Sequence, residues 1–91
     1  MDFGEQILPF LAPKLRRALE KFREAEPVSW AMLEEIRLRA EQPLQLEAGQ
    51  SALVTAAGGL TAEPGLALKV ENEDVFRTLQ LIAGNSLYTL E

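Results

Sequence analysis

Two arginines, Arg37 and Arg39, are the residues of this 91-residue chain whose type and spacing could do chemistry. They stand two positions apart in the stretch LEEIRLRAEQPLQLEAG, residues 33–49, so in a β-strand both side chains would point to one face. Guanidinium groups bind phosphate or carboxylate through two parallel hydrogen bonds. The alternative interpretation is a solvent-facing pair with cross-strand partners, and the spacing alone favours it.

The rest of the sequence offers little for catalysis or metal binding. It contains no cysteine and no histidine, which excludes disulfides, thiol chemistry, the usual zinc sites and an imidazole base. The glycine-rich stretch AAGGLTAEPG, residues 56–65, lacks the lysine and hydroxyl of a phosphate-binding loop and predicts a hairpin. The acidic clusters at residues 34–35 and 71–74 lack the spacing of a calcium loop. We therefore predict no catalytic residue and no metal site.

The charge of the chain is unevenly distributed. The net charge is −5; residues 1–39 hold seven basic and seven acidic side chains, whereas residues 40–91 hold two basic and seven acidic ones. An acidic half repels phosphate backbones, so we expect no nucleic-acid partner. No apolar run approaches the length of about 20 residues that spans a bilayer. The first residues carry acids where a signal peptide needs positive charge, which predicts a cytoplasmic protein.

Helical periodicity dominates the first third of the chain. We expect a helix from Glu5 to Ala25, interrupted at Pro9 and Pro13. One apolar face follows from the three- and four-residue steps between Leu11, Leu15, Leu19 and Phe22. A short helix with Ser29 as its N-cap should follow Pro27.

Three side chains in and near these helices have further expected roles. Arg16 and Glu20 have the i, i+4 spacing of a surface ion pair. Trp30, like Tyr88 near the C-terminus, should pack in the core or against another domain.

The period changes to two residues from Glu34 onward. Apolar residues at positions 36, 38 and 40 alternate with charged residues at positions 35, 37 and 39, which predicts a half-buried strand. Alternation continues at Leu44 and Leu46, Gly58 and Gly59 predict a hairpin, and the stretch LALKV, residues 66–70, predicts another strand.

The closing segment reads as a helix over residues 71–84 with Asn72 as its N-cap. Its predicted buried stripe consists of Val75, Phe76, Leu79 and Ile82. Gly84 should end this helix, and a further helix should begin at Asn85 or Ser86. The sequence thus predicts one α+β domain over residues 1–91, with a small antiparallel or mixed sheet of three to four strands flanked by N-terminal and C-terminal helices.

Two stretches carry a resemblance to a known family. LEEIRLRAEQPLQL, residues 33–46, and ENEDVFRTLQLIAGNSLYTLE, residues 71–91, resemble the N-terminal region of stage III sporulation protein AA. This family comprises mother-cell ATPases of endospore-forming bacteria. The opening ILPFLAPKLRRALE, residues 7–20, also resembles the start of the family. The matching positions are Glu34 to Arg39, Pro43, Leu44, Asp74, Thr78, Leu79 and Asn85 to Tyr88. One departure is clear: the family has Gly-Arg before the proline, whereas Glu41 and Gln42 stand here.

The resemblance implies a non-catalytic domain that precedes an ATPase motor. The family is similar to the ATPases of type II secretion and type IV pili, so a RecA-like motor that binds ATP and Mg is expected downstream of Glu91. This segment itself would hold no cofactor. Arg37 and Arg39 become candidates for contact with nucleotide or a partner. Leu87, Tyr88 and Leu90 become candidates for contact with the motor domain.

The implied partners are the chain's own ATPase domain, neighbouring subunits of a homo-oligomeric ring and a membrane-associated protein of the channel between mother cell and forespore. The expected location is the mother-cell cytoplasm, peripheral to the membrane through a partner. The alternative is a free-standing acidic adaptor that binds a protein and has no nucleotide role.

Overall fold

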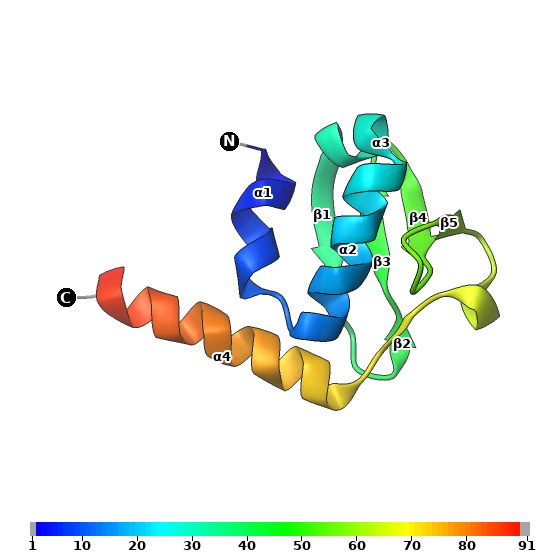
Figure 1. Ribbon diagram of the computed structural model, residues 1–91. Coiled ribbons are helices and arrows are strands. Elements are labelled where there is room, and N and C mark those ends of the chain that lie inside the picture. Colours follow the sequence, from blue (N-terminus) through cyan, green and yellow to red (C-terminus); the bar gives the residue numbers. More distant parts are fainter. Residues whose placement is uncertain (1, 90–91) are drawn as a thin grey trace.

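The computed structural model describes the backbone of residues 2–89 and the side chains of residues 2–84. Its helical elements are α1 (Phe3–Ile7), η1 (Leu8–Phe10), α2 (Pro13–Ala25), α3 (Pro27–Ala31), η2 (Pro64–Leu66) and α4 (Asn72–Thr89). Its strands are β1 (Leu33–Arg37), β2 (Gln42–Pro43), β3 (Gln45–Ala48), β4 (Ser51–Val54), β5 (Leu60–Thr61) and β6 (Lys69–Val70). Figure 1 shows α2 lying across one face of the sheet, while α4 runs below and extends beyond the other elements.

The alternating sequence forms a sheet with one face toward the helices and one face toward solvent. Four antiparallel strands pair in the order β1-β3-β4-β5. Ile36 lies opposite Leu46, which lies opposite Ala52, and this row faces the helices. The pairing of β1 shifts register between Leu33 and Glu35, so Leu33 and Ile36 both reach the core although they stand three residues apart. The predicted α+β fold, with helices at both ends, is confirmed.

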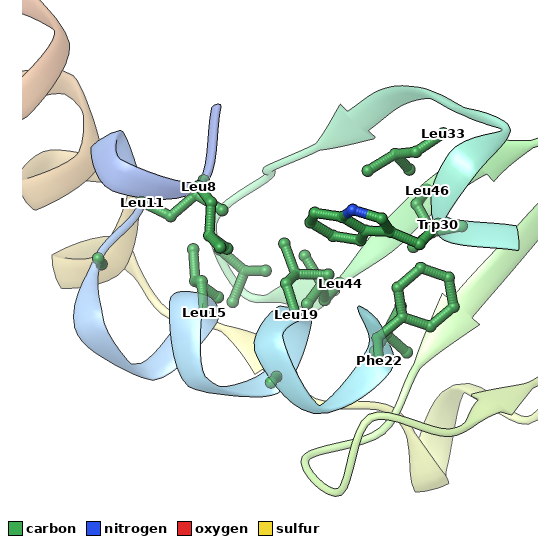
Figure 2. Close-up of a cluster of buried hydrophobic side chains, with 13 residues drawn as sticks. Leu8, Leu11, Leu15, Leu19, Phe22, Trp30, Leu33, Leu44 and Leu46 are labelled. Atoms are coloured by element: carbon green, nitrogen blue, oxygen red, sulfur yellow. The ribbon is translucent and has the colours of Figure 1, made fainter. Parts of the chain in front are cut away.

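The core forms where the apolar stripe of α2 meets the inner face of the sheet. Leu11, Leu15, Leu19 and Phe22 are all at most 1% exposed, as the periodicity predicts. They pack with buried side chains from the strands and their flanks, among them Leu44, Leu46, Val54 and Val70, and Figure 2 shows most of this cluster. Each such side chain contributes about 1.5–3 kcal/mol relative to full exposure. Pro13 is the first residue of α2, where its missing N–H costs no helical hydrogen bond.

Trp30 of α3 joins α1 to this core. Its ring contacts Phe22 edge-on at 6.2 Å between centroids, and its Nε1 donates a hydrogen bond to Glu5 of α1 at 3.0 Å. Arg23 lies 5.8 Å from the centre of the Trp30 ring and also donates to Glu5. A Cβ at Gly4 would stand 2.5 Å from Trp30, so glycine permits this close approach. The core role predicted for Trp30 is confirmed.

Two sequence-based boundaries that lie before α4 in the chain, those at Ser29 and at residues 66–70, are wrong. Ser29 lies inside α3 and is not its N-cap, because the helix begins two residues earlier at Pro27. The strand predicted over residues 66–70 is reduced to β6 (Lys69–Val70). Leu66 instead closes the 3-10 turn η2 and is 66% exposed. Proline and glycine at positions 64 and 65 favour this turn over an extended chain.

Glu41 adopts an unusual backbone conformation at the entry to the small sheet formed by β2 and β6. Its φ is 67°, in the left-handed region that favours glycine. Its N–H donates to the carbonyl of Val70 at 2.6 Å, and its carboxylate pairs with Lys69 at 3.0 Å. The predicted hairpin between β4 and β5 is confirmed, with Gly58 at φ 89°.

Substituting Glu41 tests the cost of this conformation. We expect Glu41→Gly to raise the free energy of unfolding by up to about 1 kcal/mol, because glycine adopts a positive φ without the Cβ clash. Glu41→Ala is the matched control: it removes the same ion pair with Lys69 but keeps a Cβ, so it should be neutral or slightly destabilising. Urea denaturation followed by far-UV circular dichroism measures both. A glycine variant no more stable than the alanine variant would contradict the strain argument.

Candidate functional site

Thr78 is the point at which α4 attaches to the rest of the fold. Its side chain is 3% exposed, and its hydroxyl accepts a hydrogen bond from the backbone N–H of Ala12 at 3.0 Å. Ala12 is the N-cap residue of α2, so one hydroxyl links the two helices. A buried N–H without an acceptor is costly, which makes this bond an important constraint on where α4 lies.

A cluster of charges reinforces the same junction. The Nζ of Lys14 lies 2.7 Å from Glu71 and 2.8 Å from Asp74. Asp74 also accepts a hydrogen bond from the N–H of Glu71, which is half of a capping box. The carbonyl of Glu71 accepts the first helical bonds, so Glu71 and not Asn72 occupies the N-cap position. Partial burial lowers the pKa of Lys14. The hydrogen bonds to Asp74 and Glu71 and their charges together raise it by more, so the pKa lies above the ordinary lysine value.

The helix α4 does not end at Gly84. It continues to Thr89, so the predicted break and the predicted new helix at Asn85 or Ser86 are wrong. Glycine ends a helix where it takes a positive φ, and within the described residues positive-φ glycines occur only at Gly49 and Gly58.

The apolar stripe predicted to be buried on α4 is mostly exposed. Phe76 is 63% exposed and Leu79 is 58% exposed, while Ile82 is 38% exposed; only Val75 is packed partly against the core. The cause is the docking geometry: Thr78 faces α2, and the helix then leaves the body (Figure 1), so the body covers this side of α4 only in part. An apolar helix face left open to water is typical of a protein interaction site.

An apolar groove continues this surface onto the body. It has a volume of about 300 Å³ and lies between α1, the end of β1 and α4. Its walls include Phe3 and Ile7, Ile36 and Leu38, and Leu79 and Ile82. We call the groove together with the exposed side of α4 the apolar surface. It can accept an apolar helix face or side chain, which is recognition rather than catalysis.

The structure brings Arg37 and Arg39 to one hollow on the opposite face of the sheet from the helices. Arg37 pairs with Glu35 on the same strand and with Glu47 of β3 at 3.9 Å. Both arginines line a hollow of about 160 Å³ that also contacts Gln45 of β3. The hydrogen bond that the Nε of Arg37 donates to the Glu35 carboxylate raises the pKa of Arg37 above its ordinary value. Arg37 therefore has the cross-strand partner expected of a solvent-facing residue, whereas Arg39 is exposed and, within the described residues, has no ion pair.

Other expected features have different outcomes. The side chains of Leu87 and Tyr88, and the whole of Leu90, lie outside the described residues. Among residues 2–84, no cluster of acidic side chains could hold a metal ion. No helix in the described part of the chain combines the length and apolar character needed to cross a membrane. Thr78 was not predicted as a docking residue, although a lone hydroxyl within an apolar stripe is a usable signal.

Removing the Thr78 hydroxyl tests the docking of α4. We expect Thr78→Val to lower the free energy of unfolding by about 1–3 kcal/mol, because the N–H of Ala12 loses its acceptor while side-chain volume is kept. Thr78→Ser retains the hydroxyl and should cost clearly less. Chemical denaturation compares the two. Equal losses would mean that the methyl group, and not the hydrogen bond, holds the helix.

The Lys14 cluster predicts a dependence of stability on alkaline pH. The pKa of Lys14 is raised in the folded state. The ion pairs of Lys14 therefore contribute fully to the free energy of unfolding below the ordinary lysine pKa of about 10.4, and this contribution is lost as pH rises through the pKa of the folded state. We expect Lys14→Gln to be less stable than the parent by about 0.2–1 kcal/mol at neutral pH, with the difference vanishing at high pH. Lys21→Gln on the same helix, at an exposed position, should show no such pH-dependent difference. A difference that persists at high pH would argue against the ion pair.

Known proteins provide no template for this arrangement of surfaces. Comparison of the chain with family models, with curated proteins and with solved structures found no match. The function must therefore be argued from the apolar surface, the arginine hollow and the residues that position them.

Proposed function

We propose that this chain is a non-catalytic assembly domain of a secretion-type sporulation ATPase, related to stage III sporulation protein AA. In this proposal a motor encoded beyond Glu91 binds ATP and Mg, and the domain contacts its own motor, neighbouring ring subunits and a membrane-associated channel protein. The protein would act in the mother-cell cytoplasm, held at the membrane by that partner.

The exposed apolar side of α4 is the observation that carries the proposal. Phe76 and Leu79 repeat at helical spacing as core residues do, yet both are more than half exposed. Exposing a Leu or Phe side chain forgoes about 1.5–3 kcal/mol of burial. Such a surface fits a domain that completes its packing against another domain or subunit. Leu87, Tyr88 and Leu90 extend the same segment in sequence and belong to the proposed motor contact.

The arginine hollow supports a second, electrostatic contact. Arg39 is exposed and lies two residues beyond the end of β1, and its position in the same hollow as Arg37 would allow it to reach an anionic group on a neighbour. Arg37 already shares its charge with Glu35 and Glu47. We therefore assign the larger role in contacting nucleotide or an acidic partner to Arg39, with Arg37 and Glu47 fixing the local geometry.

The reading frame beyond Glu91 gives the first test, because the proposal requires a phosphate-binding loop there. In the protein translated from that frame, Arg39→Glu should lower ATP turnover about tenfold, which is about 1.4 kcal/mol of transition-state stabilisation. Arg17→Glu, at an exposed position of α2, is the matched charge reversal and should change turnover little. The isolated 91-residue chain should not hydrolyse ATP.

The apolar surface distinguishes this proposal from the alternative of an acidic adaptor without a nucleotide role. Paired Phe76→Ser and Leu79→Ser substitutions should impair ring assembly in sedimentation experiments, while Gln80→Ser should not. An adaptor would lose its protein partner on the same substitutions but would have neither a motor sequence nor ATP turnover. A stop codon after Glu91, or ATP turnover by the isolated chain, would reject the assembly-domain proposal.

A further inference from the structure

A third cavity, open to solvent, lies between the start of α2 and the middle of α4. It measures about 310 Å³ and is lined by Pro13, Arg16, Arg77, Gln80 and Leu81. The helical repeat places the last three on a different side of α4 from Val75, Leu79 and Ile82, so this cavity is separate from the apolar groove. It shares no residue with the hollow that contains Arg37 and Arg39. Its volume falls at the lower end of small-ligand sites, about 300–1,000 Å³.

The two arginines of this cavity have no acidic partner in the described part of the chain. None of the ion pairs among residues 2–84 involves Arg16 or Arg77, although acids outnumber bases in the sequence. The surface pair predicted between Arg16 and Glu20 is therefore absent from this part of the structure. The Nε of Arg16 is buried and finds no hydrogen-bond acceptor among the residues that the structure describes. A buried N–H donor without an acceptor is rare in folded proteins, so the Arg16 guanidinium calls for an acceptor from outside these residues, either water or an anion.

We infer that this cavity binds a phosphate-type oxyanion between α2 and α4. No residue lining it is acidic, so its two guanidinium charges have no compensating charge in the wall. A phosphate group carries about −1.5 to −2 at neutral pH, which matches two arginines. The planar forks of Arg16 and Arg77 donate to its oxygens, and the side-chain amide of Gln80 supplies a neutral donor. The volume leaves room for an organic group that carries the phosphate.

Binding there would connect the two helices at the junction that Thr78 and Lys14 already form. Arg16 belongs to α2 and Arg77 to α4, so an anion held by both adds a link between them. The inference does not rest on the proposed ATPase role, since it uses other residues and applies to the 91-residue chain alone.

The experiment is a titration of the isolated chain with inorganic phosphate, followed by amide chemical shifts at constant pH and ionic strength, with chloride as the balancing anion. We expect saturable shifts around residues 13–17 and 77–81 and a dissociation constant in the millimolar range, as for a few charge-assisted bonds at a surface. Arg16→Gln and Arg77→Gln should each weaken binding about tenfold, whereas Arg17→Gln should leave it unchanged. Acetate, which carries a single charge, should bind more weakly than phosphate.

Substitution of Glu73 tests the inference in the opposite direction, because it should strengthen phosphate binding. Glu73 stands one helical turn before Arg77, at the spacing of an ion pair. Glu73→Gln removes a competing carboxylate and should tighten phosphate binding. Circular dichroism and spectral dispersion confirm that each variant is folded. Absence of saturable shifts with phosphate, or equal binding by the parent and the Arg16 and Arg77 variants, would overturn the inference. Weaker binding by Glu73→Gln would also count against it.

Discussion

The hydrogen bond from the N–H of Ala12 to the hydroxyl of Thr78 is the contact on which the functional surfaces depend. It fixes which side of α4 faces α2, and that choice leaves Phe76 and Leu79 in water. The same choice places Arg77 beside Arg16 at the mouth of a cavity. A single buried hydroxyl, reinforced by the Lys14 ion pairs, thus determines both the apolar surface and the proposed anion site.

The basic side chains that form ion pairs lie in different places from those that do not. Four of the nine basic side chains form ion pairs in the described part of the chain, and three of these join elements: Lys14 joins α2 to α4, Arg23 joins α2 to α1, and Arg37 joins β1 to β3. Of the five other basic side chains, Arg17 and Lys21 are exposed on α2, whereas Arg16, Arg39 and Arg77 line hollows. The paired cations are explained by the elements that they join. The unpaired cations that line hollows are therefore the ones that indicate binding.

Local patterns in the sequence were sufficient for the body of the fold. The apolar stripe of α2, the two-residue period around Ile36 and the turn at Gly58 each depend on neighbours close in sequence, and all three were predicted. The exposure of Phe76 was not predicted, because periodicity identifies an apolar helix face but not the element that packs against it. Arg37 and Arg39 line one hollow as their spacing predicts, although the predicted strand ends at Arg37 and leaves Arg39 outside it. The partner Glu47 depends on strand register, and the cavity at Arg16 depends on how two helices cross.

Trp30 gives this small protein a built-in optical reporter. It is the only tryptophan in the sequence and is packed against Phe22, Arg23 and Glu5 at the contact between α1 and α3. A charged carboxylate and a guanidinium next to an indole make its emission sensitive to any loosening of α1. Its hydrogen-bond, ring and cation partners within the described residues belong to α1 and α2, so its signal follows the body and separates melting of the body from detachment of the C-terminal helix.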